Sequence, residues 1–141
     1  MIDCLIVGDS IAVGVSQIRK ECAAIVKSGI NSKVWNDKHL DKIMAARVKT
    51  LIISLGANDY KGINTEGNIR LLRNLANAER VFWLLPSQKL KPSQVEAVKK
   101  VAEQFGDTVI PRPETNISAD GVHPTYTGYK ILAEKTKIRD Q

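Results

Sequence analysis

The sequence predicts an α/β fold with three layers, α/β/α, in which a parallel sheet lies between two layers of helices. Apolar runs of strand length alternate with segments of helical periodicity from one end of the chain to the other. The strand runs are apolar on both faces, which is typical of parallel strands covered by helices. With 141 residues, 43% of them hydrophobic, the chain is expected to form one domain over residues 1–141.

Five strands are expected, because five short apolar runs are bounded by turn residues. The first run ends at a Gly-Asp-Ser turn, and the fourth is stopped by Pro86. The predicted strands cover residues 2–7, 23–27, 50–55, 80–85 and 108–110.

Helices are predicted between the strands. The segment 37–47, for example, carries Leu40, Ile43, Met44 and Arg47 at helical spacing. The ends of the other helices are predicted from residues that favour particular positions. Thr favours the N-cap, Pro favours the first turn, and Gly favours the position that ends a helix. The predicted helices are 11–22, 37–47, a third capped by Thr65, a fourth from Pro92 to Gly106, and a fifth from about Pro124 toward Lys137.

The chain carries a net charge of +6, with a sequence pI near 9.4. Such a charge attracts polyanions, but the lysines and arginines are scattered over helix faces and aromatic residues make up only 5%. Nucleic-acid binding is therefore not expected. No apolar run is long enough for a membrane span, and the strand pattern begins almost at Met1, so no signal peptide is expected and the cytoplasm is the default location. A mature form without its leader would look the same, so secretion stays open as the alternative. The oligomeric state is not predicted.

The two cysteines, Cys4 and Cys22, show neither a metal-ligand spacing nor a disulfide framework. Cys4 lies within the first apolar strand. We therefore expect it to be a buried, reduced thiol.

Three residues have the chemistry of a nucleophilic hydrolase. Ser10 follows the first strand in the block Gly8-Asp9-Ser10, and the carboxyl ends of parallel strands are where open α/β sheets build ligand sites. A serine hydroxyl needs a base, and neutral His123 can accept its proton. Asp120, three residues earlier, can orient that ring in a tight turn. The other histidine, His39, is expected on a helix surface.

Acyl transfer also needs hydrogen-bond donors for the developing oxyanion. Asn58 follows the third strand and offers a side-chain amide at the same edge of the sheet as Ser10. The backbone N–H of Ser10, at a helix start, is a second donor. A third is expected from the loop after the second strand, between Gly29 and Ser32.

Three sequence blocks, in this order, resemble those of the SGNH (GDSL) hydrolase superfamily: Gly8-Asp9-Ser10, Gly56-Ala57-Asn58-Asp59 and Asp120-Gly121-Val122-His123-Pro124. The resemblance implies a flavodoxin-like fold with strand order 2-1-3-4-5 and ester hydrolysis without metal or cofactor. It also implies Ser10 as nucleophile, His123 as base and Asp120 as its partner, with an oxyanion hole formed by the Ser10 N–H, the Asn58 side chain and a backbone N–H of the second block. Aligning Gly29-Ile30-Asn31-Ser32 with that block places Ser32 at the oxyanion glycine, with Gly29 as the alternative.

The predicted function is hydrolysis of small acyl esters through an acyl-enzyme, with O-acetyl groups on carbohydrate as one candidate substrate. The expected partner is thus a small-molecule or carbohydrate ester. Two alternatives stay open: a lipase or thioesterase for longer acyl chains, and a non-catalytic binding module that retains the fold. Lys89, Lys91 and Arg112 are expected to flank the crevice; solvated loop charge is the favoured interpretation, and recognition of an anionic or sugar-rich polymer is the alternative.

Overall fold

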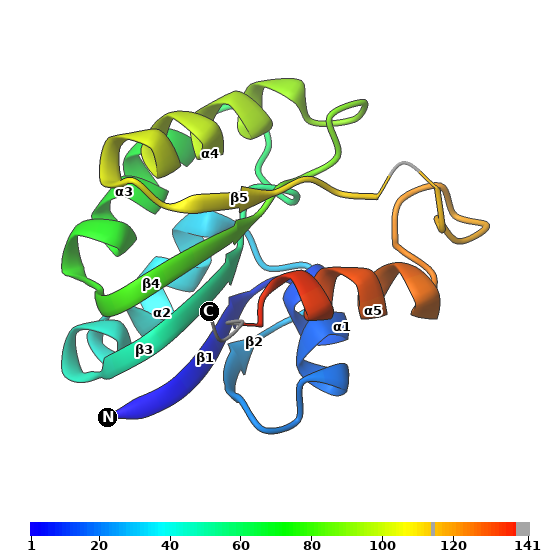
Figure 1. Ribbon diagram of the computed structural model, residues 1–141. Coiled ribbons are helices and arrows are strands. Elements are labelled where there is room, and N and C mark those ends of the chain that lie inside the picture. Colours follow the sequence, from blue (N-terminus) through cyan, green and yellow to red (C-terminus); the bar gives the residue numbers. More distant parts are fainter. Residues whose placement is uncertain (114, 138–141) are drawn as a thin grey trace.

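The computed structural model describes residues 1–113 and 115–137 (Figure 1). Its five parallel strands are hydrogen-bonded in the order β2-β1-β3-β4-β5, as predicted, with helices on both faces. The strands are β1 (Ile2–Gly8), β2 (Ala23–Val26), β3 (Arg47–Ser54), β4 (Asn77–Leu84) and β5 (Thr108–Ile110). The helices are α1 (Ser10–Ile18), α2 (Ser32–Ala45), α3 (Thr65–Leu75), α4 (Pro92–Phe105) and α5 (Tyr126–Lys135).

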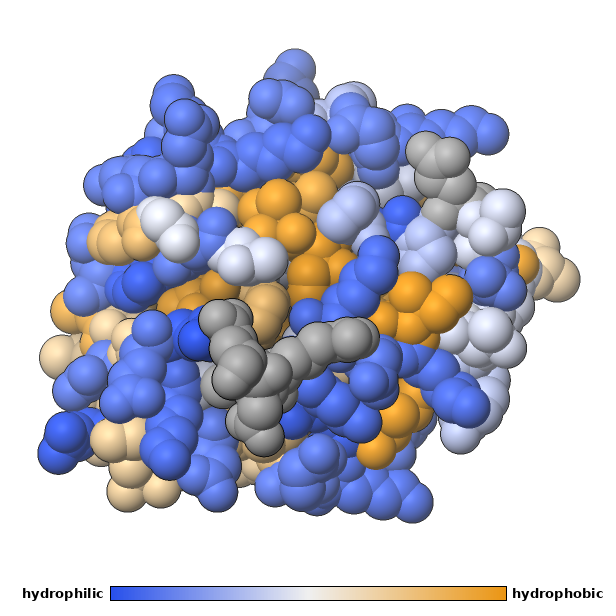
Figure 2. All heavy atoms as spheres, viewed as in Figure 1, coloured by the Kyte–Doolittle hydropathy of each residue, from blue (hydrophilic) through white to orange (hydrophobic). Residues whose placement is uncertain are grey.

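Two hydrophobic clusters hold the three layers together. Helices α2, α3 and α4 cover one face of the sheet, while α1 and α5 cover the other. The strand side chains alternate between them: Val7 and Ile53 belong to the first cluster, and Ile6 and Ile52 to the second. Figure 2 shows hydrophobic surface gathered in the middle of the face drawn, with polar and charged side chains around it.

The turn between β1 and α1 requires glycine. Gly8 has φ of +132°, and a Cβ there would collide with the carbonyl oxygen of Ser54 on β3. Asp9 then acts as N-cap of α1, its carboxylate accepting the N–H of Ile11. Ser10 is therefore the first residue of α1, at the carboxyl end of β1.

Several predicted boundaries differ from the observed ones. Helix α2 begins at Ser32 rather than at residue 37, because the side chain of Asn31 caps it by accepting the Val34 N–H. Helix α1 ends at Ile18 rather than at residue 22. Thr65 is not an N-cap: Asn64 caps α3, and its side chain accepts the N–H of Gly67. The limits Pro92 and Gly106 are confirmed, since Gly106 ends α4 in the left-handed conformation.

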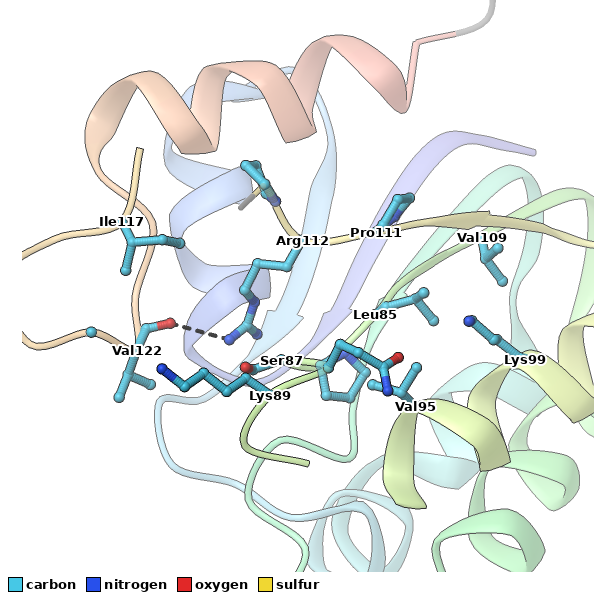
Figure 3. Close-up of a pocket in the computed structure, with 14 residues that line it drawn as sticks. Leu85, Ser87, Lys89, Val95, Lys99, Val109, Pro111, Arg112, Ile117 and Val122 are labelled. Carbon is cyan, nitrogen blue, oxygen red and sulfur yellow. Dashed lines mark hydrogen bonds between the residues drawn. The ribbon is translucent and has the colours of Figure 1, made fainter. Parts of the chain in front are cut away.

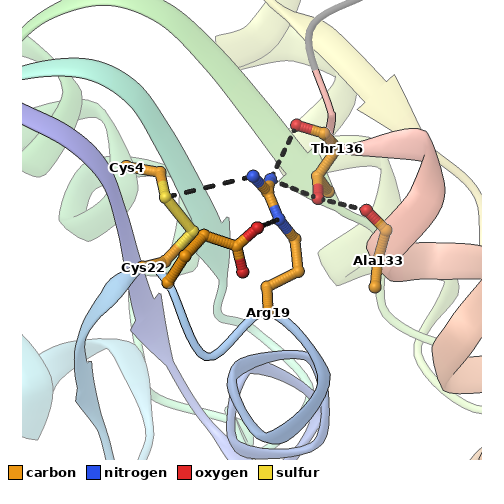
Figure 4. Close-up of a disulfide and its surroundings, with 6 residues drawn as sticks. Cys4, Arg19, Cys22, Ala133 and Thr136 are labelled. Atoms are coloured by element: carbon orange, nitrogen blue, oxygen red, sulfur yellow. Dashed lines mark hydrogen bonds and ion pairs between the residues drawn. A yellow bond between two sulfur atoms is a disulfide. The ribbon is translucent and has the colours of Figure 1, made fainter.

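The prediction of a reduced Cys4 thiol is wrong, because Cys4 and Cys22 form a disulfide (Figure 4). Leu5 on β1 is in register with Ala23 on β2, so the residues just before them are also brought together. Buried Arg19 lies beside this bond and donates from Nη1 to the carbonyl and hydroxyl oxygens of Thr136, just after α5.

We expect the disulfide to contribute about 3 kcal/mol to the free energy of unfolding, from closure of an 18-residue separation in the unfolded chain. Urea unfolding of the oxidised protein, with and without dithiothreitol, measures it. The double variant Cys4→Ala/Cys22→Ala is the control and should be insensitive to the reductant. Equal stabilities of oxidised and reduced wild type would contradict this expectation.

Candidate active site

Ser10 and His123, 113 residues apart in the sequence, meet at the carboxyl end of the sheet. The Oγ of Ser10 lies 3.0 Å from Nε2 of His123. Both residues are half-buried, so the hydroxyl is accessible to a ligand and still held by the ring. A serine hydroxyl at this distance from an imidazole nitrogen is in hydrogen-bond reach of a base.

Asp120 completes a hydrogen-bonded chain with these two residues. Its Oδ2 lies 2.7 Å from Nδ1 of His123, while Oδ1 accepts the backbone N–H groups of Val122 and His123 and the hydroxyl of Ser118. The His123 side chain and these donors together hold the pKa of Asp120 well below its ordinary value. The carboxylate is therefore ionised and directed at the ring nitrogen opposite Ser10.

The loop that carries His123 is held mainly by its own hydrogen bonds. The backbone N–H of Ser118 donates to the His123 carbonyl at 2.8 Å, and the Ser118 hydroxyl oxygen, whose hydrogen goes to Asp120, lies 2.9 Å from the same carbonyl. Ile117 and Pro124 form an antiparallel bridge. From outside the loop, Nη1 of Arg112 donates to the carbonyl of Val122. These bonds position a ring whose side chain is 42% exposed.

Asn58 lies at the same edge of the sheet, in the loop after β3. It is half-buried, and its Nδ2 donates to the carbonyl of Ile30 at 3.1 Å. A carboxamide nitrogen carries two hydrogens, so one remains for a ligand.

The structure does not leave the Ser32 amide free, contrary to the prediction for this residue. Ser32 is fully buried, and its backbone N–H donates to Oδ1 of Asp59 at 2.8 Å. The alternative, Gly29, fits better: it is exposed, with φ of +80° and open space around its Cα. Among the described residues, no hydrogen bond uses the Gly29 N–H.

Asp59 is a site residue that sequence reasoning missed. Its Oδ2 accepts the hydroxyls of Ser32 and Thr65, at 2.6 and 2.7 Å, and its carbonyl accepts Nζ of Lys91 and Nε2 of Gln94. Lys91 is thus bound to the backbone here and, unlike the other predicted cations, is not among the residues that line the groove described below. The only sequence signal was an aspartate directly after Asn58.

Asp9, which directly precedes Ser10 in the turn between β1 and α1, has no exposed surface. Its Oδ1 accepts the hydroxyl of Ser54 at 2.8 Å and the N–H of Ile11 at 3.1 Å. Within the described part of the chain, Oδ2 has no hydrogen-bond partner. Burial raises the pKa of Asp9 to about 6, although the Ser54 hydroxyl, the backbone N–H groups and the charge of Arg112 oppose the shift.

A groove of about 720 Å³ lies beside the His123 loop (Figure 3). Gly121 and Val122 of that loop line it, together with the segment after β4, one side of α4 and the segment after β5. Pro86, in its lining, lies next to Gly56, two residues before Asn58. The lining thus includes chain neighbours of His123 and a contact of the turn before Asn58, whereas Ser10, His123 and Asn58 are not themselves among the described lining residues.

Over residues 1–113 and 115–137, no group of three or more His, Cys, Asp or Glu side chains could hold a metal ion. Within the same ranges, no helix has the length and apolarity needed to cross a membrane.

Comparison with solved structures shows that the chain shares its fold with a GDSL-like lipase and with acetyl xylan esterases. A GDSL-like lipase from Bacteroides thetaiotaomicron has a TM-score of 0.75 at 19% identity, over 94% of this chain and 84% of that chain. A variant of an acetyl xylan esterase from Geobacillus stearothermophilus has a TM-score of 0.70 at 17% identity, over 99% and 97%. A catalytic mutant of that esterase, with alanine in place of a serine, has a TM-score of 0.66 at 17% identity, over 94% of this chain and 91% of that chain.

No protein-family model matches the sequence, and comparison with curated proteins gives no match. At these identities the likeness establishes the fold, and function is argued from the site.

The raised pKa of Asp9 predicts a pH-dependent free energy of unfolding. A carboxyl whose pKa is higher in the folded state stabilises the fold below its unfolded pKa, and that contribution is lost as pH rises through the folded value. The difference between 3.8 and about 6 corresponds to about 3 kcal/mol for the complete titration. The Asp9→Asn variant cannot ionise at this position. Relative to it, the free energy of unfolding of the wild type should fall by about 2 kcal/mol between about pH 4.5 and about pH 7.5.

Urea unfolding across this range measures the effect. Asp3→Asn, at an exposed position on β1, is the control and should follow the wild type. A constant stability difference between wild type and Asp9→Asn over the whole range would rule out the raised pKa.

Proposed function

We propose that this protein is a serine ester hydrolase acting on small acyl esters through an acyl-enzyme. The observation that carries the proposal is the continuous hydrogen-bonded chain from Ser10 through His123 to Asp120, at 3.0 and 2.7 Å, at the carboxyl end of the sheet. Nucleophile, base and orienting carboxylate have the mutual geometry that acyl transfer requires. The GDSL-type fold of the neighbours, among them an acetyl xylan esterase, supports it.

In the first half of the reaction, Ser10 Oγ attacks the ester carbonyl carbon while its proton passes to Nε2 of His123. The imidazolium is stabilised by the Asp120 carboxylate on the other nitrogen. The carbonyl electrons move to oxygen, and when the tetrahedral intermediate collapses they re-form the carbonyl. The alcohol then leaves with the proton held by His123, and the acyl group stays on Ser10.

In the second half, His123 takes a proton from water, and the hydroxyl attacks the acyl carbon. Collapse of this intermediate breaks the bond to Ser10 Oγ, which recovers its proton from His123, and the acid is released. In both halves the oxyanion would accept hydrogen bonds from the Ser10 N–H, the second hydrogen of Asn58 Nδ2 and the N–H of Gly29. Gly29 replaces Ser32 in this role, because the Ser32 amide is bound to Asp59.

The Ser10→Ala variant tests the nucleophile. We expect it to fold normally and to lose p-nitrophenyl acetate hydrolysis by a factor on the order of 10³ or more. Mass spectrometry of the wild type after treatment with a fluorophosphonate should find the adduct on Ser10. Ser93→Ala, at an exposed position on α4, should keep full activity. Undiminished turnover in Ser10→Ala would refute the assignment and leave a non-catalytic binding module or another nucleophile.

The Asn58→Ala variant tests the oxyanion hole. Loss of a side-chain donor that acts on the transition state should lower kcat by about 10²–10³ with little change in KM. Because the substitution also removes the bond to Ile30, thermal unfolding is measured alongside. The matched control is Asn74→Ala, on the exposed side of α3. An unchanged kcat in a folded Asn58→Ala protein would exclude Asn58 from the oxyanion hole.

A further inference from the structure

The groove beside the His123 loop has an apolar interior. Leu85, directly after β4, and Val95, on α4, contribute nearly buried side chains to it, and Val109 of β5 adds a half-buried one. Pro111 and Ile117 extend this apolar surface toward the loop. A concave, largely apolar lining of about 720 Å³ falls within the usual size of a small-molecule site.

Three cations reach the same groove from three different segments. Lys89 comes from the loop after β4, Lys99 from α4 and Arg112 from the segment after β5. In the view of Figure 3, Lys89 and Arg112 lie on one side and Lys99 lies on the other. The lining residues that the structure describes include no Asp or Glu.

Arg112 links the positive charge of the groove to the site that contains Ser10 and His123. Its guanidinium donates to the carbonyl of Val122, the residue before His123. Burial lowers the pKa of Arg112, while the nearby Asp9 and Tyr129 raise it, so the cation lies in a partly desolvated environment. A desolvated charge acts more strongly on a ligand than one in bulk water.

We propose that this groove binds the alcohol portion of the ester substrate, and that this portion combines an apolar face with a negatively charged group. The apolar interior of the groove would contact the apolar face of this alcohol portion, and its negative group would be bound by Lys89, Lys99 and Arg112. The groove begins at Gly121 and Val122, on the side of His123, the residue that returns a proton to the departing alcohol. This assignment rests on the proposed hydrolase function and narrows it to anionic esters.

A pair of esters that differ in one charge tests the proposal: 4-acetoxybenzoate, whose alcohol portion is anionic, and its neutral methyl ester. We compare the ratio of their kcat/KM values in the wild type and in Lys89→Gln/Lys99→Gln. Any difference in intrinsic reactivity between the esters cancels, because it is the same for both proteins. Solvent-exposed charges have modest effects, so the ratio should fall about three- to tenfold in the variant, and less at high salt.

The control is Lys100→Gln/Lys135→Gln, which removes the same charge from exposed positions on α4 and α5 that do not line the groove. It should keep the wild-type ratio. An unchanged ratio in Lys89→Gln/Lys99→Gln, or an equal fall in the control, would overturn the proposal without touching the hydrolase assignment.

A binding measurement separates the groove from catalysis. In Ser10→Ala, which cannot form the acyl-enzyme, 8-anilinonaphthalene-1-sulfonate should bind about three- to tenfold more weakly once Lys89 and Lys99 are also replaced by Gln. N-phenyl-1-naphthylamine, which lacks the sulfonate, should bind both proteins equally. If wild type hydrolyses neither acetate ester, the hydrolase proposal fails, and this measurement still decides the groove. Equal weakening of both probes would show that the lysines do not select an anion.

Discussion

Both oxygens of the Asp59 carboxylate, which has no exposed surface, accept hydrogen bonds: Oδ1 from the Ser32 N–H, and Oδ2 from the hydroxyls of Ser32 and Thr65. A buried carboxylate is costly unless its oxygens are satisfied in this way. The bonds join the start of α2, the loop after β3 and the start of α3. Since Asn58 directly precedes Asp59, this network also fixes the backbone from which the Asn58 amide reaches the site.

Carboxylates in three different environments surround the proposed nucleophile. Asp59 is buried with both oxygens bonded, whereas Asp9 is buried with one oxygen bonded, and burial raises its pKa to about 6. Asp120 is exposed, and the His123 side chain and backbone N–H groups lower its pKa. Of the three, only Asp120 is hydrogen-bonded to His123, while the two buried groups hold the turns at the strand ends.

The His123 loop differs from the strand-end turns, because its position depends on local bonds rather than on burial. Ser118 and Asp120 bond within the loop, and Arg112 reaches it from the segment after β5. The same arginine lines the groove, so the element that supports the histidine also faces the proposed ligand. An anion bound in the groove would therefore interact with Arg112, which holds the His123 loop, as well as with Lys89 and Lys99.

Much of the architecture could be predicted from the sequence. The five strands and the limits of α4 were predicted within a few residues. Both depend on local chemistry: apolar runs of strand length in the first case, and Pro92 at the start and Gly106 at the end of the helix in the second. The sequence also indicated that Ser10, His123 and Asp120 lie close together, because their placement at strand ends and the three-residue spacing of the aspartate and histidine are local features of the chain.

What only the tertiary structure decided is pairing between distant segments. Cys4 and Cys22 meet because β1 and β2 pair in one register, and nothing in an 18-residue separation states that register. The Ser32 amide donates to Asp59, and not toward the proposed oxyanion hole, for a similar reason: a backbone N–H has no sequence signature, and its partner is 27 residues away. The apolar periodicity and the reactive side chains were readable from the sequence because each is local, whereas the partners of buried polar groups are set by how the loops fold against one another.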